Sequence, residues 1–263
     1  MSKKTNASFL RLLGPAAAVL LAFGAGQAYA GPYEFGWVTD SGGTGNSAQR
    51  TFTDSDGFGH SSTLKARAYA TSNNDGTGNF VARNLGIYTG GLGVDSGTSL
   101  DPNTTPDHSM DNVGPNDVIL FEFDAANYNP TGLTIGWRNN DSDLQVWIGG
   151  GALAAGLNLT SYSGCSGSVC DAGELAALGF TLITAGLNDL TENVERTLST
   201  SLTGRYMIVA GRFNRGDEDD YVKISGLAAR VPQQQVPEPG VLGLLGAGLA
   251  ALGWSRRRKT KVA

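Results

Sequence analysis

The sequence predicts an all-β fold, built as an antiparallel β-sandwich or a jelly-roll-like domain. Apolar residues come in short runs that alternate with polar residues, which is the period-two pattern of half-buried strands. Glycine is abundant, at 38 of 263 residues, and Gly, Asn, Asp and Ser separate the runs as turn residues do. Strong helix formers are sparse between the two ends of the chain, and no period typical of a repeat array is visible.

Eight segments carry the strand pattern. The clearest is VILFEFD, which places Ile119, Phe121 and Phe123 on one face and Glu122 on the other. In chain order the predicted strands are Tyr33–Val38, Thr63–Ala70, Phe80–Tyr88, Val118–Asp124, Leu133–Trp137, Leu144–Ile148, Arg205–Phe213 and Tyr221–Leu227. One further segment, GELAALGF, suits a helix and a non-helical conformation equally well and covers Gly173–Phe180.

The N-terminus has the pattern of a signal peptide over residues 1–30. A basic head precedes an apolar run from Leu12 to Ala25, and GQAYA then places small residues at Ala28 and Ala30. Cleavage is expected after the second of these alanines. A retained membrane anchor is the alternative, but the apolar run is short and Gly14–Pro15 interrupts it.

The C-terminus is predicted to carry a short transmembrane helix over residues 240–255. Its uncharged stretch runs from Gly240 to Trp254, which as a helix measures about 22 Å. That length falls short of the ~30 Å hydrocarbon core, so the helix would span only with local thinning or snorkelling. A basic tail, residues 256–263, follows at once and is expected to stay cytoplasmic. The domain would then lie on the outer side of the membrane.

The residues around this helix form a specific combination. They are Val236, Pro237, Glu238 and Pro239 before it, and Arg256, Arg257 and Arg258 after it. The combination resembles the PEP-CTERM sorting signal of Gram-negative bacteria. The resemblance implies that an exosortase-type protease cuts near the motif and passes the protein from the inner membrane to the cell surface. Proline blocks helix propagation, so the linker over residues 231–239 is expected to be extended and accessible to a protease. A permanent C-terminal anchor is the alternative.

The charge of the remaining segment, the exported domain over residues 31–230, limits its partners. The whole chain has a formal charge of −5, but three cations lie in the signal peptide and five in the tail. The domain therefore keeps 11 Lys and Arg against 23 Asp and Glu, a formal charge near −12. Nucleic acid is not an expected partner, because phosphate binding needs a basic face. Divalent cations are compatible with so many aspartates.

The only two cysteines, Cys165 and Cys170, flank the small flexible sequence SGSV. Because the chain is expected to reach an oxidising compartment, a local disulfide is the favoured interpretation. It would fasten a small loop and contribute little to global stability. The spacing is not that of a Cys-x-x-Cys redox pair, and zinc would need more ligands than two cysteines supply.

A second motif lies in Gly91–Asp124. It consists of Gly-Leu-Gly-Val at residues 91–94, then His108, Asp111 and Asn112, and finally Phe121 to Phe123. This order is similar to a subset of exosortase-dependent surface proteins in which G-L-G-V precedes H-x-x-D-N and an F-E-F strand. The resemblance implies a surface protein and names no reaction.

The acidic residues of this segment are open to three interpretations. Asp95, Asp107, Asp111 and Asn112 can converge with backbone carbonyls on calcium. The same side chains also suit Asx turns that shape a long connection before a strand, which is the more common use. Catalysis by His108 with a neighbouring aspartate is a third interpretation, disfavoured because no G-x-S-x-G nucleophile elbow accompanies it.

Two other acidic segments have weaker patterns. Asp141–Asp143 spaces two carboxylates as ion-binding loops often do, without completing an EF-hand. Arg215–Asp220 contains four acidic residues between two predicted strands and is best explained as a solvated hairpin tip.

Together these features favour a non-enzymatic cell-surface or extracellular-matrix protein, associated with exopolysaccharide or biofilm and sorted by its tail. The alternative is a carbohydrate-binding module in which Trp137, Trp147 or tyrosines stack on exopolysaccharide. Their alternating strand positions favour core packing over a stacking platform. The least favoured class is a secreted hydrolase, for which paired carboxylates would suffice.

Overall fold

The computed structural model describes residues 33–40, 44–95, 108–165, 173–183, 187–212, 219–232 and 246–250. Chain contacts group Pro32–Pro232 into one compact unit and the two ends of the chain into another. The predicted signal peptide lies outside the described residues.

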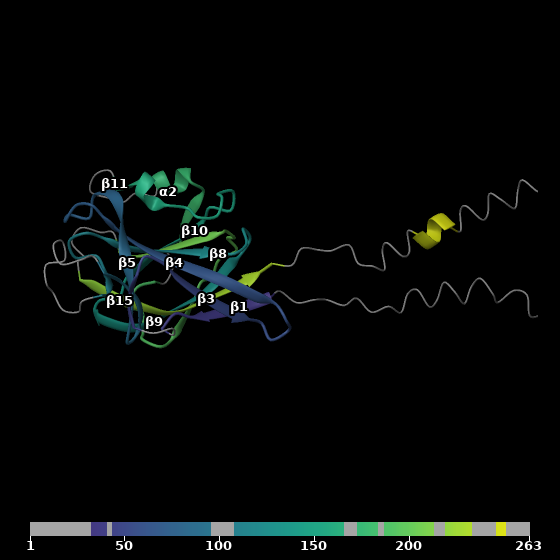
Figure 1. Cartoon of the computed structure of the whole chain (residues 1–263), viewed down its shortest axis with the longest axis horizontal. Helices are drawn as coiled ribbons and strands as arrows, with labels where there is room; N and C mark the ends of the chain where they lie inside the picture. The colour runs from purple at the N-terminus through teal and green to yellow at the C-terminus, as the bar shows by residue number, and fades with distance from the viewer. Residues whose placement is uncertain are drawn as a thin grey trace, which may run out of the picture. The chain divides into compact units, whose positions relative to one another are not determined.

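The regular secondary structure of the first unit consists almost entirely of strands (Figure 1). In chain order they are β1 (Tyr33–Val38), β2 (Gly45–Ser47), β3 (Arg50–Ser55), β4 (Ser61–Thr71), β5 (Gly78–Tyr88), β6 (Gly91–Asp95), β7 (Met110–Asp111), β8 (Asp117–Phe123), β9 (Asn129–Asn140), β10 (Leu144–Gly149), β11 (Ser163–Cys165), β12 (Phe180–Ile183), β13 (Glu195–Thr197), β14 (Tyr206–Gly211) and β15 (Asp220–Val231). Two short helical turns accompany them, η1 (Leu159–Ser161) and α2 (Gly173–Ala177).

The described strands form a single antiparallel sheet that folds over itself. Its main path is β12-β10-β14-β8-β4-β5-β6-β15-β9-β13, and β1, β2, β3, β7 and β11 pair off this path. β5 carries the path from one layer to the other, because Phe80–Arg83 pairs with β4 whereas Asn84–Tyr88 pairs with β6. The prediction of an antiparallel all-β fold is confirmed. The two layers are joined through β5 rather than being separate sheets.

The main core lies between the two layers. β8 contributes Ile119, Phe121 and Phe123, the three residues that the sequence places on one face. Residues of the opposite layer pack against them, among them Phe35, Trp37, Leu92, Ile135, Ile224 and Leu227. At roughly 25 cal/mol per Å² of apolar surface removed from water, this buried layer is the main stabilising term of the fold.

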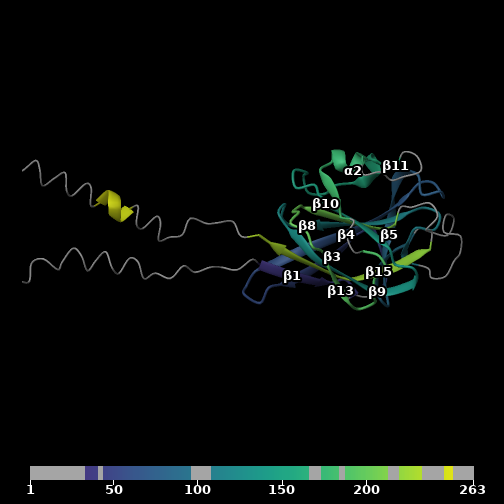
Figure 2. The same cartoon turned by 180° about the vertical axis from the view of Figure 1, so that it is seen from behind.

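A second core covers the other face of the β12-β10-β14-β8-β4 layer. Val118 and Leu120 of β8 belong to it, with Trp147, Tyr206 and residues of η1 and α2. Figure 2 shows α2 over this layer, seen from behind. All seven residues of β8 are buried as a result. The alternation of β8 separates two cores instead of a core and solvent, so Glu122 is buried, contrary to what an alternating strand suggests.

Several local features differ from the sequence prediction. The connection before β8 contains two strands, β6 and β7, which glycines and short length conceal in the sequence. Gly173–Phe180 combines both expected conformations, because α2 ends at Ala177 and β12 begins at Phe180. Asp220 lies at the start of β15 with 0% of its surface exposed and is not part of a solvated hairpin tip.

The predicted membrane segment is described only in part. Residues 246–250 are helical, and the rest of residues 240–255 lies outside the described residues. No helix within the described ranges is both long and apolar enough to cross a membrane. The predicted transmembrane helix therefore gains no support from the structure.

Candidate functional site

β15 brings the two halves of the motif over residues 91–112 together. Leu92 of β6 pairs with Ile224 of β15, and β7 pairs with the preceding residues of β15. The amide of Val94 also donates directly to the carbonyl of Ser109, at 3.2 Å. The Gly-Leu-Gly-Val and His-x-x-Asp-Asn segments are therefore neighbours in space.

The closest approach of the two segments is at Gly93. A Cβ at this position would clash with the backbone carbonyl of His108, so glycine is the residue that leaves room for the crossing chain. His108 itself has a φ of 73°, which non-glycine residues adopt rarely. The glycine and the histidine of the motif are thus two parts of one backbone crossing.

Four side chains gather beside this crossing and form what we call the Lys223 cluster, which consists of Tyr88, His108, Trp137 and Lys223. The rings of His108 and Tyr88 stack, with centroids 4.2 Å apart and planes inclined by 12°. The Lys223 Nζ lies 5.6 Å from the Tyr88 ring centroid and 5.0 Å from that of Trp137. Both distances are within the range of a cation–π interaction.

The strand register explains why Lys223 faces away from the main core. Its neighbours Val222 and Ile224 both belong to that core, and alternate residues of a strand point to opposite faces. Trp137 is its cross-strand partner on β9. Only 8% of Lys223 is exposed, and this desolvation lowers the pKa of its ammonium below the usual value for lysine.

Asp95, a predicted calcium ligand, lies at the edge of the Lys223 cluster. Its Oδ1 is 4.0 Å from Nδ1 of His108. Its other carboxylate oxygen accepts a hydrogen bond from Asn46, whose own side-chain oxygen accepts one from the Tyr88 hydroxyl at 3.0 Å. The contacts of Asp95 thus tie β2, β5 and β6 to the motif.

Asp111 and Asn112 have different partners. The carboxylate of Asp111 accepts from the amide of Val113 at 3.1 Å, the geometry of an Asx turn. Asn112 is buried and exchanges two hydrogen bonds with Asp220, at 2.7 and 3.0 Å. Asp107 lies outside the described residues. Asp111 therefore shapes a turn, whereas Asn112 belongs to the network of Asp220.

Carboxylates that could hold a metal ion occur elsewhere, at Asp141, Asp143 and Asp189. One side-chain oxygen from each lies within 4.8 Å of the others. Asp143 is already bound by the guanidinium of Arg212 at 2.9 Å and by the amide of Asp189 at 2.9 Å. Three carboxylates against one arginine leave a net negative charge, and oxygen donors of this kind suit calcium. The sequence indicated the first two aspartates but not Asp189.

Asp220 links this acidic group to the motif. It accepts from the amide of Asp143 at 2.6 Å, from the amide of Arg212 at 3.2 Å and from Asn112. Several donors satisfy its buried charge, as a buried carboxylate requires. The sequence gives little indication that Asp220 is a buried hydrogen-bond acceptor, since Asp220 is only the last of several consecutive acidic residues.

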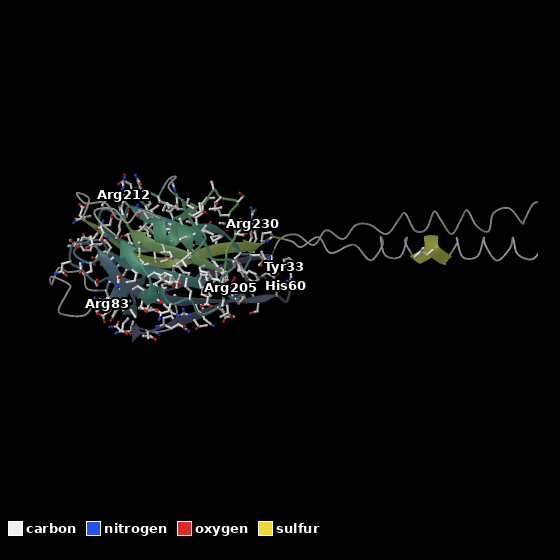
Figure 3. All side chains as sticks on the ribbon, turned by 90° about the horizontal axis from the view of Figure 1, so that it is seen from above. Tyr33, His60, Arg83, Arg205, Arg212 and Arg230 are labelled. Atoms are coloured by element: carbon white, nitrogen blue, oxygen red, sulfur yellow. The ribbon has the colours of Figure 1, made fainter. Side chains whose placement is uncertain are left out.

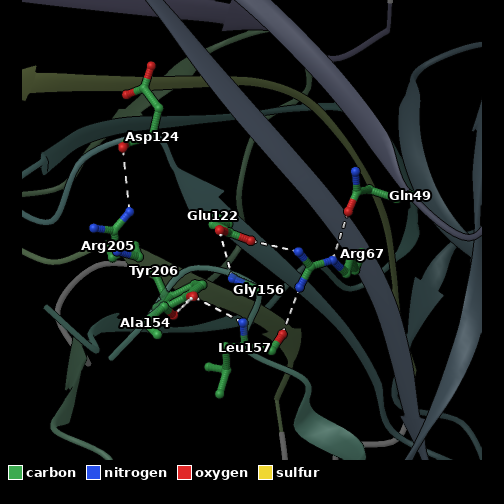
Figure 4. A network of polar contacts seen from close by, with 9 residues as sticks. All are labelled: Gln49, Arg67, Glu122, Asp124, Ala154, Gly156, Leu157, Arg205 and Tyr206. Atoms are coloured by element: carbon green, nitrogen blue, oxygen red, sulfur yellow. Dashed lines mark hydrogen bonds and ion pairs between the residues drawn. The ribbon is translucent and has the colours of Figure 1, made fainter. Parts of the chain in front are cut away.

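A separate polar network holds the loop that contains Ala154, Gly156 and Leu157 against β4 and β8 (Figure 4). The Arg67 guanidinium binds Glu122 at 2.6 Å and the carbonyl of Leu157 at 2.7 Å. The second oxygen of Glu122 accepts from the amide of Gly156 at 2.9 Å. The Tyr206 hydroxyl donates to the carbonyl of Ala154 and accepts from the amide of Leu157; burial raises its pKa. These contacts fix the loop over the second core.

The remaining predicted residues are largely outside the described part of the chain. This holds for all seven residues of the sorting signal and for Cys170. Cys165 is described as the last residue of β11. The disulfide therefore stays a prediction. Of the tryptophans named as a stacking platform, Trp147 is a core residue with 1% exposure, whereas Trp137 is half-buried in the Lys223 cluster.

Comparison with known proteins identifies one feature. The family model of the PEP-CTERM protein-sorting motif matches residues 235–258. No curated protein and no solved structure matches the chain.

Proposed function

We propose that the chain is a non-enzymatic protein of the cell surface or extracellular matrix, associated with exopolysaccharide or biofilm. The proposal is supported by the PEP-CTERM sorting motif, which marks the chain as an exported target of an exosortase. The observation that carries the proposal is the position of the signal relative to the fold. β15 ends at Val231, and the matched motif begins at residue 235. Cleavage near the motif would therefore leave every described strand in the released protein.

A secreted hydrolase stays the least favoured class. The His108 ring stacks on Tyr88, and the sequence has no G-x-S-x-G nucleophile elbow to accompany it. Broad substrate screening of the released protein would detect an enzyme of this class.

Intact-mass analysis of protein from the surface of the native host tests the proposal. We expect chains that begin near Gly31 and end between Val236 and Pro239. Replacing Arg256, Arg257 and Arg258 by neutral residues should impair retention or processing, because the basic cluster that keeps the C-terminus on the cytoplasmic side is lost. Recovery of only full-length chains that retain Trp254 would contradict it.

Carbohydrate binding is a second candidate function, favoured by the position of Trp137. Trp37 and Trp147 are each 1% exposed and belong to the cores. Trp137 instead lies half-buried on the outer face of its layer, beside a cation and a second aromatic ring. Aromatic surfaces with a few placed polar groups are typical of ligand sites.

A further inference from the structure

We propose that the Lys223 cluster binds an acidic polysaccharide, with Lys223 contacting a uronate carboxylate and Tyr88 and Trp137 contacting its sugar rings. The inference rests on the proposed surface or matrix function and names the site and the ligand class that such a protein would use.

The first step is the unusual state of Lys223. The exported domain has a formal charge near −12 and only two lysines, Lys65 and Lys223. Yet no ion pair to Lys223 occurs among the described residues; its ammonium contacts the faces of two aromatic rings instead. Burial lowers its pKa. A carboxylate that reached the ammonium would compensate the lost hydration.

The second step is the arrangement of the rings. Tyr88 and Trp137 are both half-buried and come from β5 and β9, with β6 and β15 between them in the sheet. Glycines allow this approach, because a Cβ at Gly90 would clash with Trp137 and one at Gly91 would clash with the backbone of Ile224. The two rings therefore lie on either side of the ammonium, where the glycines leave room for Trp137 and for the backbone of β15.

The third step concerns the other charges at the site. His108 stacks on Tyr88. Asp95 lies 4.0 Å from that histidine and is bound by Asn46. Among the described residues, Asp95 thus has partners within the protein, while the ammonium of Lys223 contacts only the two rings. A uronate fits this pattern, since it combines one carboxylate with the apolar face of a pyranose ring.

The experiment uses the processed protein recovered from the cell surface, with polygalacturonate as the acidic probe and dextran as the neutral one. Binding is followed by tryptophan fluorescence, because Trp137 is half-buried while Trp37 and Trp147 are 1% exposed. We expect saturable quenching by polygalacturonate and none by dextran. Lys223→Gln should weaken binding about tenfold or more, the effect of losing roughly one charged contact. Tyr88→Leu should weaken it without altering the fluorophore.

Lys65→Gln is the matched control, because it removes the same charge from the other layer and should leave the dissociation constant within about twofold. Equal weakening by both lysine variants would overturn the inference, as would displacement by inorganic phosphate as strong as that by galacturonate oligomers. Failure of the wild-type protein to bind would also overturn it. If that same protein still ended between Val236 and Pro239, the proposed sorting would stand and only the site would be wrong.

Discussion

Tyr33 pairs with Val231, so the first and the last strand of the domain are hydrogen-bonded neighbours at their outer ends. The register continues through Trp37, which pairs with Leu227, and both of these residues lie in the main core. The Tyr33 ring also contacts His60 at the tip of the β3–β4 hairpin, with centroids 3.8 Å apart (Figure 3). The C-terminal strand is therefore an integral part of the fold up to Val231.

A chain truncated after Pro232 should consequently keep the stability of the whole domain. Its melting temperature is expected to stay within about 2 °C of the longer protein, because no described strand is shortened. Truncation after Gly226 should instead unfold the domain, since it removes buried Leu227 and Ala229 and the partners of most of β1. Circular dichroism melts of both chains provide the comparison. Equal stability of the two truncations would contradict the assigned role of β15.

The Arg67–Glu122 ion pair should make a measurable contribution to stability. The Glu122 side chain is 5% exposed and that of Arg67 20%. Arg67→Met would leave a buried carboxylate whose remaining hydrogen-bond donor, among the described residues, is the Gly156 amide. This change should lower the free energy of unfolding by about 3 kcal/mol. Glu122→Gln should cost less, because the partly exposed guanidinium regains water. Urea unfolding of both variants and of the double variant measures the coupling; additive losses would show that the pair is not coupled.

Strands were predictable where apolar side chains recur at every second position of the sequence. Leu144, Val146 and Ile148 recur at every second position, and β10 coincides with this segment apart from one added residue. β6 escaped prediction because two of its first three residues, Gly91 and Gly93, have no side chain to alternate. Their absence of a Cβ serves close backbone approaches that become visible only in three dimensions.

The candidate sites were less predictable than the strands, because their residues come from distant parts of the chain. Glu122 meets Arg67 from 55 positions away, and Asp189 meets Asp143 from 46 positions away. The sequence analysis singled out His108 and Trp137 but not Lys223, and it gave no sign that these residues would lie together with Tyr88. Local patterns establish strand faces, whereas these contacts depend on which strands become neighbours.

The predicted disulfide between Cys165 and Cys170 can be tested directly. Non-reducing peptide mapping of freshly isolated protein should yield one cross-linked peptide, because the exported chain encounters an oxidising compartment. Cys165→Ser should shift the melting temperature only slightly, since the loop that the bond closes is short. Two thiols that react fully with an alkylating reagent would refute the bond.

Lys223 should make stability depend on pH in a defined direction. Its folded pKa is lowered by desolvation, so the unfolded chain binds more protons in the window between that pKa and the ordinary value near 10.4. The contribution of Lys223 to the free energy of unfolding therefore rises as the pH increases from the folded pKa to the unfolded pKa. This contribution is lowest at pH values below the folded pKa. Urea midpoints from about pH 7.5 to 9.5, below the range where tyrosines ionise, should rise more in the wild type than in Lys223→Gln. Parallel profiles would rule out the shift.

Calcium binding stays a prediction, and the structure suggests how to locate it. A domain with a formal charge near −12 should gain stability from a cation that binds only the folded state. At free calcium a hundredfold above the dissociation constant, the gain is about 2.7 kcal/mol, which a thermal melt resolves. Sodium at matched ionic strength controls for screening.

The residues responsible can then be separated by two matched aspartate substitutions. Asp189→Asn should abolish the calcium-specific shift if the ion is held by Asp141, Asp143 and Asp189, whose carboxylate oxygens lie within 4.8 Å of one another. Asp111→Asn should leave that shift intact, because the carboxylate of Asp111 already accepts the amide of Val113. The reverse result would return the site to the motif predicted from sequence. Equal melting shifts in sodium and calcium would exclude a specific site, and the acidic residues would then serve only as turn and network formers.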